Sequence, residues 1–117
     1  MNNQHSDTFI FKEKRAVIKV NCADIVFFES DGHYVNVHMN TGEVFTTRCT
    51  LARLIEMLDR DVFIKVRRGI VVNLCYVHSI NPSEVLLEYE WQSLPVGRSC
   101  RATLEAAMDK FNEKSAQ

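Results

Sequence analysis

The fold class is decided by residues 25–39, which read IVFFESDGHYVNVHM. Their first four residues form an apolar run that predicts a buried strand. The Asp31-Gly32 dipeptide that follows is typical of a tight hairpin, because such a turn needs positive φ values. Beyond the turn, apolar and polar side chains alternate over residues 34–39, so this strand has one buried and one open face. The stretch predicts an antiparallel β-hairpin.

Strand patterns also occupy most of the remaining chain. Further strands are predicted over Phe9–Phe11, Ala16–Val20, Val44–Arg48, Phe63–Arg67, Ile70–Asn73, Val77–Ile80, Val85–Tyr89 and Gln92–Val96. One helix is predicted over Leu51–Leu58, where apolar residues recur at helical spacing after a Thr50 N-cap, and another from about Arg101. The predicted fold class is therefore mainly β, with two short helices.

Length and composition indicate a single domain. The chain has 117 residues, of which 46% are hydrophobic and 25% charged, and halves of this length would be too small to bury separate cores. It contains no apolar run of the ~20 residues that a membrane helix needs. Its first residues lack the apolar centre of a signal peptide, so we expect a cytoplasmic protein with no membrane association.

Four cysteines stand far apart in the sequence, at positions 22, 49, 75 and 100. None belongs to a C-x-x-C pair, the spacing typical of zinc and redox sites. In the cytoplasm we expect them to be reduced and mostly buried, as small hydrophobic side chains. No metal site is predicted, because His33 and His38 fall on opposite faces of a continuous strand.

The net charge of -1, from 14 basic and 15 acidic residues, hides a local segregation. Residues 62–83 and 91–104 contain no acidic side chain, and a third acid-free stretch holds Arg48 and Arg53. The basic side chains of the first two stretches are Lys65, Arg67, Arg68, Arg98 and Arg101. Such segregation is typical of a phosphate-binding face on a neutral protein, although a solvated strand face with unpaired charges has the same pattern.

A bend beside Gly69 is expected to expose the first basic cluster. Lys65 and Arg67 share the open face of the predicted strand, so Arg68 would fall on the apolar face, which is costly for a guanidinium. Because glycine permits a bulge or turn, we expect Arg68 to swing outward on a projecting basic loop.

The second basic cluster lies where a helix begins. The helix macrodipole disfavours Arg98 and Arg101 at this end, whereas free backbone N–H groups there can hold a phosphate. A docked anion would satisfy both features. The alternative is that each arginine pairs with a nearby carboxylate, and Glu105 is a candidate partner for Arg101.

Catalytic patterns are weak. Ser30, Asp31 and His33 are close in sequence, but no nucleophile elbow or glycine-rich oxyanion segment accompanies them. The glycine-rich loops that bind nucleotide phosphates are missing from the sequence. His33 is distinguished only by its position after a turn, where it should be exposed. An ordinary polar loop residue would be exposed there as well. We therefore expect no catalysis and no cofactor.

Four motifs together resemble a known family. They are residues 25–35 (IVFFESDGHYV), the helix 51–58, residues 63–73 (FIKVRRGIVVN) and residues 94–99 (LPVGRS). In this order they resemble the LytTR family of DNA-binding domains, the output domains of LytR/AgrA-type bacterial response regulators. The resemblance sets the predicted domain at residues 9–111, between a flexible segment at 1–8 and a polar tail at 112–117.

The resemblance implies an elongated fold of about ten strands in antiparallel sheets, whose loops enter the DNA major groove in place of a recognition helix. It also implies two copies of the domain bound to direct repeats of double-stranded DNA, and a receiver domain upstream. Carried over to this chain, the contacts come from the loop holding His33, the segment holding Arg67 and Arg68, and the segment holding Arg98.

The predicted contacts divide into two kinds. Base contacts are assigned to Arg68 and Arg98, each of which stands beside a glycine that opens the chain, and to His33. Phosphate contacts are assigned to the other four cations, Lys65, Arg67, Arg101 and Arg48.

The chain departs from the family pattern at two positions. Arg67 stands where the family usually has histidine, and Gly69 stands where serine is common, so Gly69 is not expected to contact DNA. Asn73 matches the family, and we expect it to satisfy backbone groups locally. The main alternative function is a non-catalytic, β-rich protein–protein interaction module.

Overall fold

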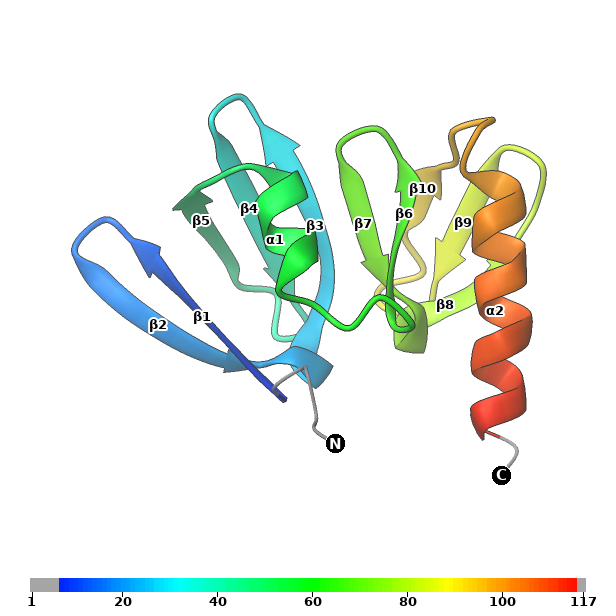
Figure 1. The fold of residues 1–117 in the computed structure, drawn as a ribbon, viewed down its shortest axis with the longest axis horizontal. Helices are drawn as coiled ribbons and strands as arrows, with labels where there is room; N and C mark the ends of the chain where they lie inside the picture. Colours follow the sequence, from blue (N-terminus) through cyan, green and yellow to red (C-terminus); the bar gives the residue numbers. More distant parts are fainter. Residues whose placement is uncertain (1–6, 116–117) are drawn as a thin grey trace.

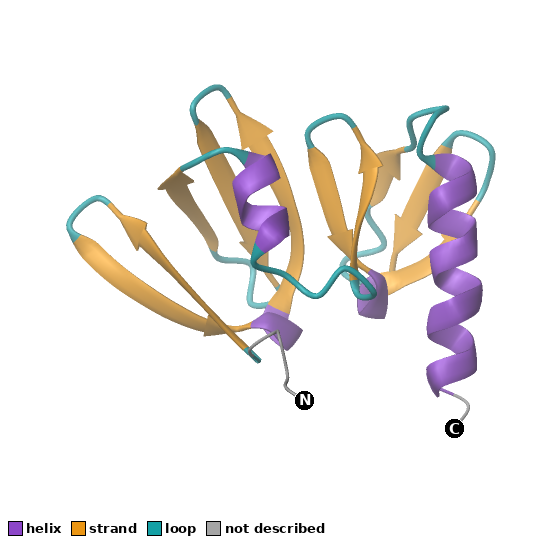
Figure 2. Ribbon diagram, viewed as in Figure 1, coloured by secondary structure: helices purple, strands orange, loops and turns teal. Residues whose placement is uncertain are grey.

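The computed structural model describes residues 7–115, which form three antiparallel sheets and two helices (Figure 1, Figure 2). The strands are β1 (Thr8–Glu13), β2 (Ala16–Asn21), β3 (Ile25–Asp31), β4 (Tyr34–Met39), β5 (Val44–Arg48), β6 (Phe63–Arg67), β7 (Ile70–Asn73), β8 (Val77–Ile80), β9 (Glu84–Leu87) and β10 (Ser93–Pro95). The helices are α1 (Leu51–Glu56) and α2 (Arg101–Ser115), and the 3-10 turns η1 (Cys22–Asp24) and η2 (Leu74–Tyr76) precede β3 and β8. The predicted fold class is confirmed.

A five-stranded sheet in the order β5-β4-β3-β7-β6 forms the middle of the molecule. The β1–β2 hairpin and α1 pack on one side of it and enclose a core that includes Phe9, Phe28 and Leu54. The β10-β9-β8 sheet and α2 pack on the other side around a second core that includes Phe27 and Leu104. The longest dimension is 40 Å, with the β1–β2 hairpin at one end and α2 at the other (Figure 1).

The apolar run that begins β3 is explained by these two cores. Ile25 and Phe28 belong to the first core, whereas Val26 and Phe27 belong to the second. A register shift between Ile25 and Phe27, in the pairing with β4, accompanies this change of face. All four side chains are buried, so a continuous apolar run replaces the alternation of a half-exposed strand.

The hairpin turn after β3 is displaced by one residue from the prediction. Asp31 pairs with Tyr34, and the two turn positions are held by Gly32 and His33. Gly32 has a φ of 64°, the left-handed value that glycine adopts without steric cost. The displacement puts His33 at the exposed tip of the hairpin.

The helices differ from the prediction in length. α1 begins at Leu51 as predicted, with the Thr50 hydroxyl accepting a hydrogen bond from the Arg53 backbone N–H at 3.2 Å, but it ends at Glu56. β1 begins at Thr8 and α2 continues to Ser115, so ordered elements extend slightly beyond the predicted domain on both sides. The rest of the segments predicted to be flexible or frayed, residues 1–6 and 116–117, lies outside the described residues.

None of the four cysteines, all of which lie among the described residues, forms a disulfide. Cys75 is exposed and the other three are half-buried, so the prediction that most of them are buried was wrong. The reason is their position, because each lies in a turn or loop between elements instead of in a strand facing one of the cores.

Candidate nucleic-acid interface

Three segments that are distant in sequence meet at one edge of the molecule. They are the β3–β4 turn, the β6–β7 turn and the loop between β10 and α2, all at the upper edge of Figure 1. Two backbone hydrogen bonds join them: the Ser30 N–H donates to the Gly69 carbonyl at 2.8 Å, and the Gly97 N–H donates to the Val66 carbonyl at 2.7 Å. The two turns and the loop therefore have a defined position relative to one another.

The β6–β7 turn projects its cations as the sequence predicts. A register shift between Lys65 and Arg67 leaves Val66 buried while both flanking cations are exposed. Arg68 and Gly69 occupy the turn itself, Arg68 is exposed, and Gly69 has a φ of 88°. The bulge and the turn together carry Arg68 away from the apolar face of the strand.

Two glycines allow the three segments to approach one another closely. A Cβ on Gly69 would lie 2.8 Å from the Ser30 hydroxyl oxygen, and one on Gly97 would lie 3.3 Å from the Arg67 Cα. The second contact is to backbone, which would have to shift by a few tenths of an ångström to admit a Cβ. Gly97 therefore lets the loop carrying Arg98 run directly against the end of β6.

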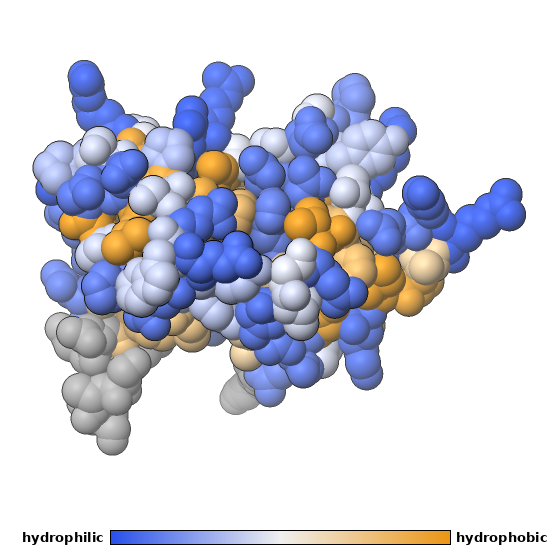
Figure 3. All heavy atoms as spheres, turned by 180° about the vertical axis from the view of Figure 1, so that it is seen from behind, coloured by the Kyte–Doolittle hydropathy of each residue, from blue (hydrophilic) through white to orange (hydrophobic). Residues whose placement is uncertain are grey.

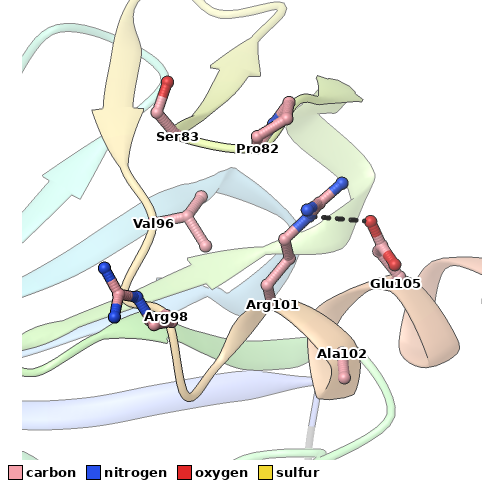
Figure 4. Close-up of a pocket in the computed structure, with 7 residues that line it drawn as sticks. All are labelled: Pro82, Ser83, Val96, Arg98, Arg101, Ala102 and Glu105. Atoms are coloured by element: carbon pink, nitrogen blue, oxygen red, sulfur yellow. Dashed lines mark hydrogen bonds and ion pairs between the residues drawn. The ribbon is translucent and has the colours of Figure 1, made fainter.

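The two arginines near the start of α2 differ in their partners. The Arg101 Nε donates to the Glu105 Oε2 at 3.0 Å, so for this arginine the alternative of a local carboxylate partner is the one that the structure shows. Arg98 is exposed, points away from that ion pair, and has no carboxylate partner among the described residues (Figure 4). Both line a hollow that also contains Ser83 and Val96 (Figure 4). Arg98 therefore carries the uncompensated charge at this position.

His33 and Arg48 lie at the β3–β4 end of the same edge. His33 is exposed at the hairpin tip. Arg48, the last residue of β5, is the cross-strand partner of Tyr34, and its guanidinium carbon lies 5.9 Å from the centre of the tyrosine ring. A cation over an aromatic face is attracted by the ring quadrupole, which favours one orientation of Arg48.

A second hollow adjoins the two hairpin tips. Lys65, Arg68 and Gly32 line it together with residues around the start of α1, including Cys49. Burial raises the pKa of the Cys49 thiol, and the charge of Arg53 opposes that rise. Cys49 is thus a neutral thiol at neutral pH and a poor nucleophile, which argues against a cysteine-based reaction beside this hollow.

The edge has a surplus of free positive charge. Within residues 7–115, the predicted contact residues that make no ion pair with a carboxylate are Arg48, Lys65, Arg67, Arg68 and Arg98. Seen from behind, hydrophilic side chains stand out along the upper edge of the molecule (Figure 3). Because none of these cations is neutralised within the described part of the chain, the edge can attract an anionic partner.

Sequence reasoning missed one residue at this edge. Tyr34 is the first residue after the β3–β4 turn, and 43% of it is exposed although it is a large aromatic residue. The alternation of β4 places it on the open face, and its position beside the turn was the signal that could have identified it. Its ring and hydroxyl group are available next to Arg48 and His33.

The described residues contain no helix that is long and apolar enough to cross a membrane. Nor does this part of the chain hold a group of three or more histidine, cysteine or acidic side chains placed to bind a metal ion.

Comparisons with known proteins agree on one family. The model of the LytTr DNA-binding domain matches residues 15–109. The chain is 37% identical over 65 residues to the CO-responsive transcriptional regulator RcoM of Rhodospirillum rubrum, which is 56% of this chain and 27% of that protein. It is 34% identical over 97 residues to the heme-containing CO-sensing transcriptional regulator RcoM 2 of Paraburkholderia xenovorans, which is 79% of this chain and 36% of that protein.

A solved structure has the same fold. It is the LytTr DNA-binding domain of a Bacillus cereus protein described as a methyl-accepting/DNA response regulator. The two structures superpose with a TM-score of 0.73 over 88% of this chain and 97% of the other, at 20% sequence identity. The elongated, multi-sheet architecture is therefore shared in spite of low sequence identity.

Proposed function

Since the chain belongs to the LytTR family of DNA-binding domains, we propose that it binds double-stranded DNA sequence-specifically as the output domain of a bacterial transcription regulator. In this proposal the two hairpin turns and the loop before α2 enter the major groove. The observation that carries it is the edge where these segments meet, held together by backbone hydrogen bonds and bearing five cations that no carboxylate neutralises within residues 7–115.

Arg68, Arg98 and His33 are proposed to read bases. Arg68 and Arg98 project from a turn and a loop where neighbouring glycines allow close backbone approach, so each guanidinium can present two donors to guanine O6 and N7. His33 stands at the tip of the β3–β4 hairpin, where its ring can reach a base edge.

Lys65, Arg67, Arg48 and Arg101 are proposed to bind phosphates. Lys65 and Arg67 lie on the strand that leads into the turn, so they reach the DNA beside the segment inserted into the groove. Arg101 is expected to make the weakest phosphate contact of the four. It is paired with Glu105, so it has to leave this carboxylate or contact the carboxylate and a phosphate together.

The wider setting is also part of the proposal. Two copies of the domain bind direct repeats in the cytoplasm, as non-catalytic output domains of a longer, two-component-type regulator with an upstream receiver. Two observations support a longer regulator. The RcoM proteins are transcriptional regulators of which this chain spans about a third, and the Bacillus cereus protein is described as a response regulator.

The test is selection of binding sequences from random duplex DNA, followed by a salt titration on the selected site. We expect enrichment of one motif in two directly repeated copies. These four phosphate contacts predict a log–log salt slope of about -3.6 for each bound copy of the domain, because each contact contributes about -0.9. An unenriched pool together with a flat salt slope would contradict the proposal and favour a protein-binding module.

A further inference from the structure

The β1–β2 hairpin is a second basic surface, separate from the edge described above. Four of its side chains are basic and exposed: Lys12, Lys14, Arg15 and Lys19. None of the four makes an ion pair with a carboxylate within residues 7–115. The hairpin stands at one end of the 40 Å dimension, where its turn points up and outward and lies below the level of the three DNA-facing segments (Figure 1).

Glu13, the acidic residue at the hairpin tip, holds the hairpin against β5. The Glu13 Oε2 accepts a hydrogen bond from the Thr46 backbone N–H at 2.8 Å, which ties the end of β1 to β5. The carboxylate therefore points at the body of the protein while the neighbouring Lys12 and Lys14 are exposed to solvent.

The hairpin is also packed firmly enough to hold its cations in place. Phe9 and Phe11 are buried, and the Phe11 ring centre lies 5.6 Å from that of Phe45 on β5. The Phe9 ring meets Phe28 on β3 edge-on at 5.7 Å. Because β3 and β5 also carry the β3–β4 turn and Arg48, the hairpin cations and the DNA-facing segments belong to one packed unit.

The dimensions of DNA suggest what this surface contacts. Each base pair advances a duplex by about 3.4 Å along the helix axis, so a duplex lying along the 40 Å dimension passes about 12 base pairs across the molecule. The β3–β4 turn, the β6–β7 turn and the loop between β10 and α2 cover the middle of that length and the α2 end (Figure 1). The β1–β2 tip would then lie over the backbone to one side of the bases they read.

We propose that the β1–β2 hairpin binds the DNA phosphate backbone outside the segment read by the loops, as a sequence-independent second contact. This inference rests on the proposed function. Three of the four cations are lysines, whose compact charge suits phosphate oxygens better than bidentate base recognition. The contact lengthens the DNA footprint on one side and adds affinity without adding specificity.

The experiment compares two charge-removing double variants in the full chain. The first, Lys14→Gln with Arg15→Gln, removes two cations from the hairpin tip. The control, Arg60→Gln with Lys110→Gln, removes two exposed cations that belong neither to the hairpin nor to the three DNA-facing segments; Lys110 also gives up its ion pair with Asp61 at 3.5 Å. Affinity and salt slope are measured on the selected site within a duplex of about 30 base pairs and on a duplex trimmed to the bases that are read.

On the long duplex, the tip variant should bind at least about tenfold more weakly, with a salt slope shallower by about 1.8, because two phosphate contacts are lost. On the trimmed duplex it should equal the wild type, and its discrimination against single-base variants should be unchanged on both. The control variant should match the wild type throughout. A third variant, Lys12→Gln with Lys19→Gln, leaves the turn sequence intact and should reproduce the loss, which separates charge from any change in the turn.

Three results would overturn the inference. In the first, the tip variant binds the long duplex with the same affinity as the control variant. In the second, the tip variant loses as much affinity on the trimmed duplex as on the long one. In the third, it loses only the cooperativity between two sites, which would make the hairpin a protein contact between copies. Wild-type chain that shows no salt-dependent binding to any duplex rejects the proposed function itself, and the hairpin contact with it.

Discussion

Asn73 offers a sharp test of which polar residues serve the fold and which serve DNA binding. It is 1% exposed, although it is the last residue of the basic β6–β7 hairpin. Its Nδ2 donates to the Ile25 carbonyl at 2.9 Å, and its Oδ1 accepts from the Cys75 backbone N–H at 2.9 Å. One bond is local, as predicted, and the other reaches β3, so the side chain ties the end of β7 to the start of β3.

Replacing Asn73 with alanine should destabilise the fold by about 2–4 kcal/mol. The substitution removes two hydrogen bonds and leaves a carbonyl and an N–H without their partners, at about 1–2 kcal/mol each. A change of 1 kcal/mol shifts the melting temperature of a domain of this size by about 4 °C, so the expected decrease is about 8–16 °C.

The assay is thermal and urea unfolding of the variant beside Asn40→Ala. Asn40 also makes two side-chain hydrogen bonds, to the Asp24 carboxylate and the Tyr76 hydroxyl, but it is exposed, so water replaces them and the cost should stay below about 1 kcal/mol. At a temperature where both variants are folded, each should bind the selected DNA like the wild type. Equal stability losses would refute the argument from burial, and a loss of DNA affinity in folded Asn73→Ala would make Asn73 part of the interface.

Three further predictions concern the site and its thiols. Arg68→Ala should reduce the free energy of binding to the selected site by about 1–3 kcal/mol and relax the base preference at one or two base pairs. Lys65→Ala should weaken binding to all duplexes alike and reduce the salt slope by about one. Competition binding against single-base variants of the site distinguishes the two outcomes. Glu105→Gln should strengthen DNA binding and steepen the salt slope, because Arg101 is released for a phosphate; an unchanged titration would place Arg101 outside the interface. Partial desolvation raises the pKa of the Cys75 thiol although the residue as a whole is exposed, so iodoacetamide at pH 7.5 should alkylate it more slowly than free cysteine. Since the four cysteines form no disulfide, melting curves with and without reductant should coincide.

Local patterns in the sequence were sufficient for the elements and for the exposure of the cations. The alternation over residues 34–39 reappears in β4, whose apolar side chains are buried. The glycine that follows Arg68 does occupy a left-handed turn position, and the arginine is exposed there. These features depend on neighbours a few residues apart, where side-chain period and backbone φ are set locally.

The sequence by itself therefore determined the antiparallel β class, the hairpins, the family resemblance and the three basic or polar loops. Only the tertiary structure decided that Ser30 forms a backbone hydrogen bond with Gly69, and Gly97 with Val66. These two bonds bring the three separate loops together at one edge. The structure also decided between the alternatives that the sequence left open for the two arginines: Arg101 pairs with Glu105, whereas Arg98 has no carboxylate partner within residues 7–115. The physical reason is that pairing between distant strands follows from how both faces of the central sheet are buried, and a local pattern records that a strand is buried but not which strand lies beside it.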